Sequence, residues 1–305
     1  CTQDPKSAEL LKPFLRGKDL KRWRAEPRDL WLIFTRRGTD INAYPAIKSH
    51  LETMRIALEP KPRGWKPSGP KDKWKGRKAG SYKWFEIQDS IDYYRHFMAP
   101  KISYPHFNSV RNFAFEPLGA FSNDKSYLVP SSDLALLALL NSRVLWFLLS
   151  SMSPPVRGGY HELRVQYVET VPIPNWSQAQ KQELWVLAQN ATDVAAQAAK
   201  LQSALSRRIP DLCPPNRKPK LTNKLRKWWT LPDFVAFRAE VKKVFKTDIP
   251  LSERSEWEDW IIRDRAEIAR LTAKIERAEA KIDCIVYDLF NLNLDEITLL
   301  ESSVG

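Results

Sequence analysis

The sequence has few residues of the kinds that bind metals or form disulfides. Only three cysteines and four histidines occur in 305 residues. The cysteines, Cys1, Cys213 and Cys284, are odd in number and far apart, so neither a disulfide framework nor a zinc-binding spacing follows from them. The histidines are equally isolated, at His50, His96, His106 and His161. We therefore expect no metal site, and a reducing, cytoplasmic location.

Long apolar runs are also missing. The most apolar stretch, Leu134–Leu149, is interrupted by Asn141, Ser142 and Arg143. The pieces are too short to cross a bilayer, which takes about 20 apolar residues, so a buried helix is the better interpretation. The opening segment lacks the apolar core of a signal peptide. These features argue against a membrane partner.

Catalytic motifs are missing as well. A DNA methyltransferase needs a glycine-rich turn for the methyl donor and an Asn/Asp-Pro-Pro-aromatic motif at the target base. The sequence has neither, because Cys213–Asn216 ("CPPN") carries the two prolines without the required flanking residues. Phosphate-binding loops of the GxxxxGK[ST] type and GxSxG nucleophile motifs do not occur. We therefore expect no catalytic residues here.

One stretch carries the letters of a nuclease motif. "PDFVAFRAEVK" (Pro232–Lys242) contains PD followed by ExK. A metal-dependent nuclease needs its acids to converge on a divalent ion from adjacent strands. Here Asp233 and Glu240 lie seven residues apart in a run whose apolar residues follow helical spacing. We interpret the run as an amphipathic surface helix.

Positive charge, by contrast, is abundant. The chain has 49 Lys and Arg against 36 Asp and Glu, a net charge of +13 and a pI near 9.6. Such a balance favours phosphate backbones or anionic membranes as partners. Lys61–Lys83 concentrates it, with nine cations, one acid (Asp72) and interleaved aromatic rings. This stretch is either a solvated loop or a surface for nucleic acid.

The length suits two domains, and the pattern changes near Asn175. Residues 1–175 alternate short apolar runs with turn residues, which is typical of a mixed α/β domain. Two helices are expected, at Tyr44–Leu58 and at Asp133–Leu149 with Asp133 as N-cap. Strands are expected at Leu30–Thr35, Lys101–Pro105, Phe113–Glu116, Ser126–Pro130 and His161–Val168. The third and fourth strands could form a loose hairpin across the turn-rich segment between them.

Residues 176–305 are expected to be helical. Apolar or small residues recur at alternating spacings of three and four within 178–206 and again within 255–289, a heptad pattern. The first series is Leu184, Leu187, Ala191, Val194, Ala198, Leu201 and Leu205; the second is Ile268, Leu271, Ile275, Ala278, Ile282, Ile285 and Leu289. We expect the two helices to pair antiparallel within the chain, with pairing to another subunit as the alternative. The linking segment, 209–250, begins as a basic, proline-rich loop and continues as short helices. The expected fold class is therefore α+β.

Five stretches occur in an order and spacing that resemble one family. They are "DPKSAELLKPFLRGKDLKRW", "WLIFTRRGTDINAYPAIKSHLE", "GSYKWFEIQDSIDYYRHFMAPKISYP", "FSNDKSYLVP" and "RGGYHELRVQYVETVPIP". Together they resemble the TaqI-like C-terminal specificity domain of bacterial restriction–modification enzymes. The later "KIDCIVYDLFNLNLDEITLLE" is similar to the C-terminal ending of the same enzymes, and the helix pair resembles the spacer helices of type I specificity subunits.

The resemblance implies a target recognition domain for double-stranded DNA within a larger enzyme. It implies an adenine-specific DNA methyltransferase as the parent protein, with an upstream methyltransferase domain, S-adenosylmethionine as cofactor and, where a type II nuclease is attached, Mg²⁺. The chain itself would then be a fragment without catalytic activity or cofactor. Charge and helices alone leave two alternatives, a general nucleic-acid or RNA scaffold and a protein-interaction module.

On this interpretation two sets of residues would contact DNA. Contacts to phosphate supply affinity and register, whereas contacts to base edges supply sequence information. The phosphate candidates are Lys71, Lys73, Lys75, Arg77, Lys78, Lys83 and Arg157, with Gly76 and Gly80 allowing close approach. The base candidates are Arg36 and Arg37, whose paired donors suit guanine, and Asn108, Arg111, Asn123 and Lys125 on loops. Surface charge is the alternative for the arginines, and turn formation for the asparagines.

Overall fold

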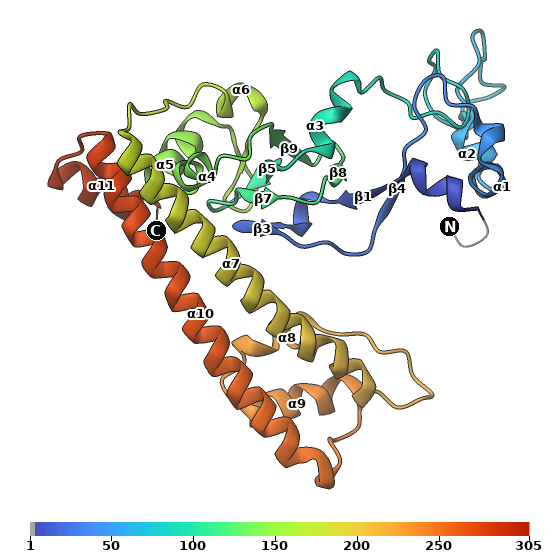
Figure 1. The fold of residues 1–305 in the computed structure, drawn as a ribbon. Helices are drawn as coiled ribbons and strands as arrows, with labels where there is room; N and C mark the ends of the chain where they lie inside the picture. Colours follow the sequence, from blue (N-terminus) through green and yellow to red (C-terminus); the bar gives the residue numbers. More distant parts are fainter. Residues whose placement is uncertain (1–3, 305) are drawn as a thin grey trace. The chain divides into compact units, whose positions relative to one another are not determined.

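The structure is a computed structural model that describes residues 4–304, so Cys1 lies outside the described part. The chain forms two compact units. Unit 1 contains the residues up to Lys21 together with Ala25–Phe107 and Ala114–Ser132, and unit 2 contains Arg22–Arg24, Asn108–Phe113 and everything from Asp133 on. The combination of short sheets and long helices confirms the α+β class (Figure 1). The predicted domain boundary at residue 175 falls inside unit 2.

Unit 1 is built on short strands. Its central strand, β5 (Lys101–Pro105), is buried along its whole length and lies between two antiparallel partners. Ile102 faces Phe115 on β7 and Val129 on β9. A second sheet pairs β1 antiparallel with β4 and parallel with β8. The strands of unit 1 are β1 (Leu11–Leu15), β2 (Leu20–Lys21), β4 (Trp31–Ile33), β5, β7 (Ala114–Glu116), β8 (Phe121–Ser122) and β9 (Ser126–Val129); β3 (Trp23–Ala25) and β6 (Phe107–Asn108) lie where the chain passes from one unit to the other.

These pairings confirm four of the predicted strands and correct the predicted hairpin. The strands β7 and β9 do not pair with each other, because β5 lies between them. The turn-rich segment between them instead contains β8, which pairs with β1. Aromatic residues hold this region together, since the ring of Phe121 stacks on Phe97 with 5.0 Å between ring centres and contacts Phe34 at 4.6 Å.

The helices of unit 1 are short. The expected helix at 44–58 is interrupted after Glu52, giving α1 (Pro45–Glu52) and α2 (Arg55–Leu58). A further turn, α3 (Arg95–Met98), precedes β5. The helix α1 buries Ile47 and Leu51 against Ile41, so its apolar face completes a small core beside β4.

Unit 2 is mainly helical. Its elements are α4 (Leu134–Leu140), α5 (Arg143–Met152), the β10–β11 hairpin (Pro155–Val156 and Tyr160–Glu162), α6 (Val165–Val168), α7 (Gln178–Arg208), α8 (Asn223–Arg226), α9 (Phe234–Phe245), α10 (Arg254–Leu289) and α11 (Leu294–Val304). The strand predicted at 161–168 is therefore wrong in its second half, which forms α6. Leu163 is 1% exposed, whereas Val165 is 47% exposed.

The polar residues that interrupt the apolar run produce a bend between α4 and α5. Asp133 caps α4 as predicted, accepting a hydrogen bond from the Ala135 amide. The side-chain amide of Asn141 pairs with both backbone groups of Phe113, at 3.0 and 2.9 Å, and Ser142 caps α5. Within residues 4–304 no single helix has the length and apolar character of a membrane span; only the α4–α5 pair, bent by 60°, meets that test jointly.

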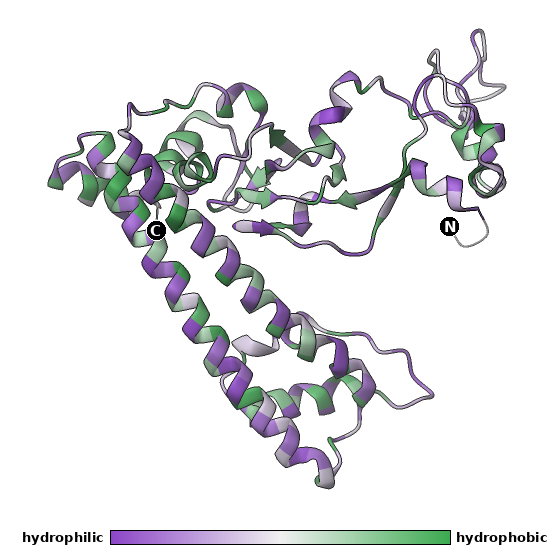
Figure 2. Cartoon of the chain, in the orientation of Figure 1, coloured by the Kyte–Doolittle hydropathy of each residue, from purple (hydrophilic) through white to green (hydrophobic). Residues whose placement is uncertain are grey.

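The two long helices, α7 and α10, pack against each other and run antiparallel (Figure 1), which confirms the predicted pairing. Ser177 and Gln180 form a capping box at the start of α7. Hydrophobic and hydrophilic residues alternate along both helices (Figure 2). The buried stripe of α7 differs in detail from the predicted seam, because Ala188 and Ala195 are buried while Leu187 and Val194 are half-buried. Since α4 also packs on α7, its buried face is wider than a two-helix seam.

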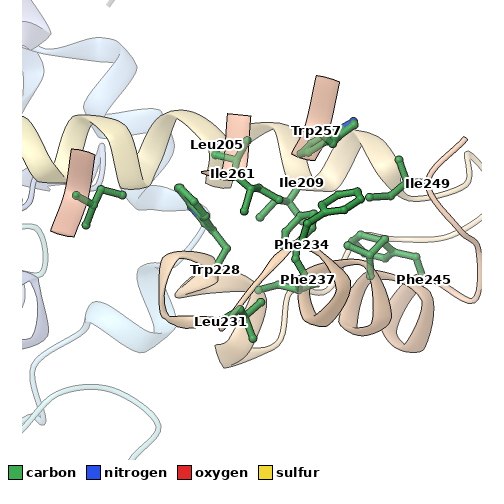
Figure 3. Close-up of a cluster of buried hydrophobic side chains, with 13 residues drawn as sticks. Leu205, Ile209, Trp228, Leu231, Phe234, Phe237, Phe245, Ile249, Trp257 and Ile261 are labelled. Carbon is green, nitrogen blue, oxygen red and sulfur yellow. The ribbon is translucent and has the colours of Figure 1, made fainter. Parts of the chain in front are cut away.

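A separate hydrophobic core lies where α7 ends and α10 begins (Figure 3). Trp228 is fully buried there, and its indole donates to the Gln202 carbonyl at 3.0 Å. The ring of Phe237 from α9 stacks against Trp257 from α10, with 6.0 Å between ring centres. The linking segment is thus a folded subdomain, which we call the tip (residues 209–250), rather than a simple connection.

The nuclease-like motif at Pro232–Lys242 does not form a nuclease site. As predicted, the stretch is a helix, α9. Asp233 caps it by accepting from the Ala236 amide at 2.7 Å, and Glu240 is buried and accepts from the Thr222 hydroxyl at 2.8 Å. The two acids therefore serve the local fold.

Candidate nucleic-acid interface

The basic stretch forms a loop that is closed at its base. Arg77 and Pro60 lie in a parallel bridge, and the Arg77 amide donates to the Glu59 carbonyl at 2.9 Å. The Lys61 amide completes the closure by donating to the Arg77 carbonyl at 3.0 Å. Gly76 is required here, because a Cβ at this position would lie 2.1 Å from the Glu59 carbonyl oxygen. We call residues 61–83 the basic loop.

Arg77 holds this base together with its side chain. Its guanidinium donates to the carbonyls of Leu58, Trp84 and Glu86 at 2.7 to 2.8 Å. Burial lowers the pKa of the Arg77 guanidinium. Its donors are committed to carbonyl oxygens, so Arg77, expected to bind phosphate, organises the loop instead.

Six of the seven lysines of the basic loop are exposed, and Lys61 is half-buried. Lys71, Lys73, Lys75, Lys78 and Lys83 all project into solvent. The one acid of the loop, Asp72, is engaged by the Ser68 amide at 2.8 Å. Two tryptophans support the loop from inside: the indole of Trp74 donates to the Glu59 carbonyl and its ring meets Trp65 edge-on. The loop thus presents exposed cations on a folded support.

Arg36 and Arg37 are neighbours with different partners. Arg37 donates to the carbonyls of Ile87 and Gln88, the second at 2.8 Å, and lies 3.8 Å from the Glu86 carboxylate. Arg36 instead stacks on the Tyr94 ring, with 3.9 Å between the guanidinium carbon and the ring centre. The structure therefore separates Arg37, which is held by backbone carbonyls, from Arg36, which is held by an aromatic side chain.

Arg36 lines a surface pocket of about 630 Å³ within unit 1. Arg95 also lies near the Tyr94 ring, with 6.0 Å from its guanidinium carbon to the ring centre. A hydrogen bond from Arg95, reinforced by the charge of Arg36, lowers the pKa of the Tyr94 hydroxyl. Two arginines therefore share one aromatic residue at the pocket wall.

The charge of the pocket is mainly positive. Lys12 lines it together with the arginines, and the one acid among the lining residues, Glu9, accepts from the Tyr44 hydroxyl at 2.8 Å. In the described chain no carboxylate forms an ion pair with Lys12, Arg36 or Arg95. The pocket can therefore receive an electron-rich group.

Sequence reasoning missed Lys12, Tyr94 and Arg95. Lys12 reaches the pocket from β1, Tyr94 from the turn before α3 and Arg95 from the start of α3. The strand β1 lies there because it pairs with β4 and the Phe34 amide donates to the Leu10 carbonyl at 2.7 Å. The pair Tyr94-Arg95 is the only local signal, and cation–aromatic neighbours of this kind also occur elsewhere in the chain.

The remaining candidates divide by exposure. Asn123 and Lys125 lie on an exposed turn in which the Asn123 side chain accepts from the Lys125 amide at 3.2 Å. Asn108 is 3% exposed. Arg157 is exposed in unit 2, at the turn of the β10–β11 hairpin. The two glycines that follow it have positive φ angles of 86° and 73° and complete the turn.

Arg111, expected on an open loop, belongs to an interior ion network in unit 2. Its guanidinium lies 3.1 Å from the Asp283 carboxylate and 3.7 Å from Glu279. Glu279 also accepts from Arg22 and from the Trp23 indole, at 2.8 and 2.7 Å. Burial raises the pKa of Asp283 despite the arginines around it. As placed here, neither Arg111 nor Asn108 is free to reach a base.

Metal ligands do not gather in residues 4–304, where no group of three or more His, Cys, Asp or Glu side chains is positioned to hold an ion. Cys213 is half-buried and Cys284 is exposed, and both are free thiols.

Comparisons with known proteins match two successive regions of the chain. Residues 12–173 match the TaqI-like C-terminal specificity domain, and residues 177–286 match a domain of unknown function, DUF8810. Among solved structures, the chain is similar to the type IIL restriction-modification enzyme MmeI, which was solved in complex with DNA, with a TM-score of 0.44 and 14% sequence identity. That similarity covers 92% of this chain and 32% of the MmeI chain. No curated protein matches the chain.

Proposed function

We propose that this chain, which belongs to the family of TaqI-like C-terminal specificity domains, is the module that recognises double-stranded DNA in a restriction–modification enzyme. In this role the basic loop binds the phosphate backbone, and the Arg36 pocket reads a base edge in the major groove. The phosphate residues are Lys71, Lys73, Lys75, Lys78 and Lys83, joined by Arg157 of unit 2.

One observation carries this proposal: a single segment, Tyr82–Gln88, supports both features. Arg77 from the basic loop lies over the Tyr82 ring at 4.4 Å, and Arg37 lies over the same ring at 5.2 Å. Arg77 also donates to the Glu86 carbonyl, and Arg37 to the Gln88 carbonyl. The base of the loop and the wall of the pocket are therefore both attached to this segment of unit 1. A sequence-specific DNA-binding protein needs its phosphate-binding and base-binding residues to be attached to each other in this way, because phosphate contacts set the register in which a base contact is made.

Arg36 is the residue we assign to base readout. Arginine with paired donors is the usual partner of guanine O6 and N7 in the major groove. A side chain already stacked on an aromatic ring loses less conformational freedom on binding than a free one. Arg37 cannot serve equally well, because its donors are directed to backbone carbonyls.

We further propose that the parent protein is an adenine-specific DNA methyltransferase in which S-adenosylmethionine is bound by an upstream domain. Where a nuclease is attached, Mg²⁺ would act there. The present chain would be non-catalytic, because its sequence lacks the glycine-rich turn and the Asn-Pro-Pro-aromatic motif. Incubating the purified chain with S-adenosylmethionine and duplex DNA should then produce no methylated adenine.

The proposed recognition is tested by selection from randomised duplexes. We expect the chain to enrich one sequence, to bind it more tightly than a scrambled duplex, and to prefer duplex DNA to RNA of the same sequence. Equal binding to all duplexes, or stronger binding to RNA, would contradict the proposal and favour a general nucleic-acid scaffold.

A further inference from the structure

The tip carries a second concentration of positive charge. Residues 217–246 contain ten Lys and Arg against two acids, Asp233 and Glu240. The helix α10, by contrast, has seven cations and nine acids over its 36 residues. The excess positive charge of residues 176–305 therefore lies in the tip and does not extend along α10.

Nine of these ten cations are exposed. They are Arg217, Lys218, Lys220, Lys224, Arg226, Lys227, Lys242, Lys243 and Lys246. The tenth, Arg238, is half-buried and forms an ion pair with Asp248 at 2.6 Å. No carboxylate of the described chain is ion-paired with any of the nine.

Three of the four acids of the tip are engaged by the protein itself, and the fourth, Asp211, is exposed. Asp233 caps α9, Glu240 accepts from Thr222, and Asp248 is held by Arg238 and Arg254. An ordinary solvated surface mixes charges of both signs, as α10 does. In the tip, Asp233, Glu240 and Asp248 each have a partner within the protein, whereas the nine exposed cations form no ion pair within residues 4–304.

The contacts bring the segments that carry these cations close together. The Arg217 guanidinium donates to the Phe245 carbonyl at 3.2 Å, and the Thr222 hydroxyl donates to Glu240 at 2.8 Å. The segment 217–222 thus runs beside the second half of α9 in the opposite direction. It places Lys218 and Lys220 next to the half of α9 that carries Lys242 and Lys243, and α8 packs on the same helix.

The tip also has a packed core beneath its surface. Its core contains Trp228, Phe237 and Phe245, each 2% exposed or less, packed on Trp257 of α10 (Figure 3). The cations therefore stand on a folded support, unlike a charged tail.

We propose that this tip is a second DNA-binding surface, which contacts the phosphate backbone of duplex DNA without reading its sequence. The inference rests on the proposed function for the choice of partner, because DNA is the polyanion that unit 1 would hold. It assigns a role to the region that matches a domain of unknown function. Its contribution would be affinity and residence on DNA, whereas unit 1 supplies sequence preference.

The test compares two variants in which the same charge is removed. The tip variant carries Lys218→Gln, Lys220→Gln, Lys242→Gln and Lys243→Gln. The control variant carries Lys200→Gln, Lys274→Gln, Arg277→Gln and Lys281→Gln, four exposed positions on α7 and α10. Binding of the 305-residue chain to a duplex is measured by fluorescence anisotropy over a range of salt concentrations. Thermal unfolding checks that both variants fold.

The tip variant should flatten the plot of log affinity against log salt by about 0.9 for each phosphate that is no longer bound, on preferred and scrambled duplexes alike. The control variant should keep the wild-type slope. Equal slopes for all three proteins, or an equal decrease in both variants, would overturn the proposal while leaving recognition by unit 1 intact.

Other outcomes separate the two proposals. Wild-type binding that shows no sequence preference and disappears in the tip variant would support the tip surface and contradict recognition by unit 1. Binding of the chain to vesicles of anionic lipid that depends on the tip lysines, with no effect on duplex binding, would assign the surface to a membrane instead. A chain that binds no duplex at all would overturn both proposals.

Discussion

Some arginines of this protein stabilise its own fold, whereas others can bind a ligand. The groups that contact each guanidinium determine which role it has. Arg77 and Arg37 are directed to backbone carbonyls, and Arg111 is enclosed by two carboxylates. Arg36 instead stacks on the Tyr94 ring and interacts with the hydroxyl of the same residue. Donors already bound to carbonyls add little to DNA affinity, because a new hydrogen bond can form only after an existing one is broken.

Replacing Arg36 with Lys should weaken sequence preference. Lysine keeps the positive charge but lacks the planar pair of donors that matches guanine. We expect discrimination at a single base pair to fall by about 1–3 kcal/mol, with the salt dependence unchanged. Selection from randomised duplexes measures this. The assignment would be contradicted if the preference weakened at many positions, or if it did not change at any position.

Replacing Arg77 with Met should destabilise unit 1. The substitution leaves three part-buried carbonyl oxygens without their donor, and hydrogen bonds to a charged group each contribute about 1.5–3 kcal/mol. We expect the free energy of unfolding in urea to fall by about 2–4 kcal/mol, less than the full sum because water can reach these carbonyls in the variant. Lys75→Met, at an exposed position of the same loop, is the matched control and should change it by less than about 0.5 kcal/mol. Similar effects of both substitutions would show that Arg77 does not hold the loop.

At the scale of elements, helix caps and breaks follow the local sequence, whereas the partner of each strand does not. Asp133 and Ser142 begin α4 and α5 because each side chain accepts from a nearby amide. The position of β8 beside β1, however, depends on a parallel pairing between Phe14 and Phe121, which lie far apart in the chain. No local pattern indicates such a pairing, so the predicted hairpin of β7 and β9 was wrong.

Placing a charge in the helix pair should separate α7 from α10. Leu271 is 1% exposed on α10, so Leu271→Asp removes apolar packing and buries an unpaired carboxylate. We expect the free energy of unfolding to fall by at least about 3 kcal/mol. The control is Ala273→Asp, at an exposed position on the same helix, which should cost less than about 1 kcal/mol. A small effect at Leu271 would show that the pair does not depend on this residue.

At the scale of the whole molecule, two segments account for the positive charge. The basic loop and residues 217–246 each carry a net charge of +8, so together they exceed the +13 of the full chain, and the rest is slightly negative. Positive charge in two limited regions favours binding at defined surfaces over non-specific attraction along the whole molecule.

Removing the loop lysines should reduce affinity for every duplex. Replacing Lys71, Lys73, Lys75 and Lys83 with Gln deletes four exposed cations and leaves Arg77 to hold the loop. The salt slope should fall by about 0.9 for each phosphate that the loop no longer binds, and the preferred sequence should remain the same. A salt titration on preferred and scrambled duplexes measures both quantities. An unchanged slope would mean that the stretch is a solvated loop.

The amino-acid sequence by itself determined the features that depend on neighbours along the chain. The heptad spacing predicted two helices that need a partner, Asp133 predicted a cap, and the ordered motifs indicated the family, whose match covers residues 12–173. The same reasoning indicated the basic loop, because charge density is visible in the sequence. It assigned Gly76 to close approach of DNA phosphate, whereas in the structure this glycine makes room for the Glu59 carbonyl.

The tertiary structure alone decided which charged side chains remain available. Arg36 and Arg37 are adjacent and chemically identical, yet Tyr94 stacks under one and the Ile87 and Gln88 carbonyls bind the other. Asp233 and Glu240 look like available acids in the sequence, but a helix end and Thr222 engage them, and the lysines of the tip form no ion pair within residues 4–304. The physical reason is that a side chain's availability depends on hydrogen-bond partners brought close by packing, and those partners lie at sequence distances that no local pattern records.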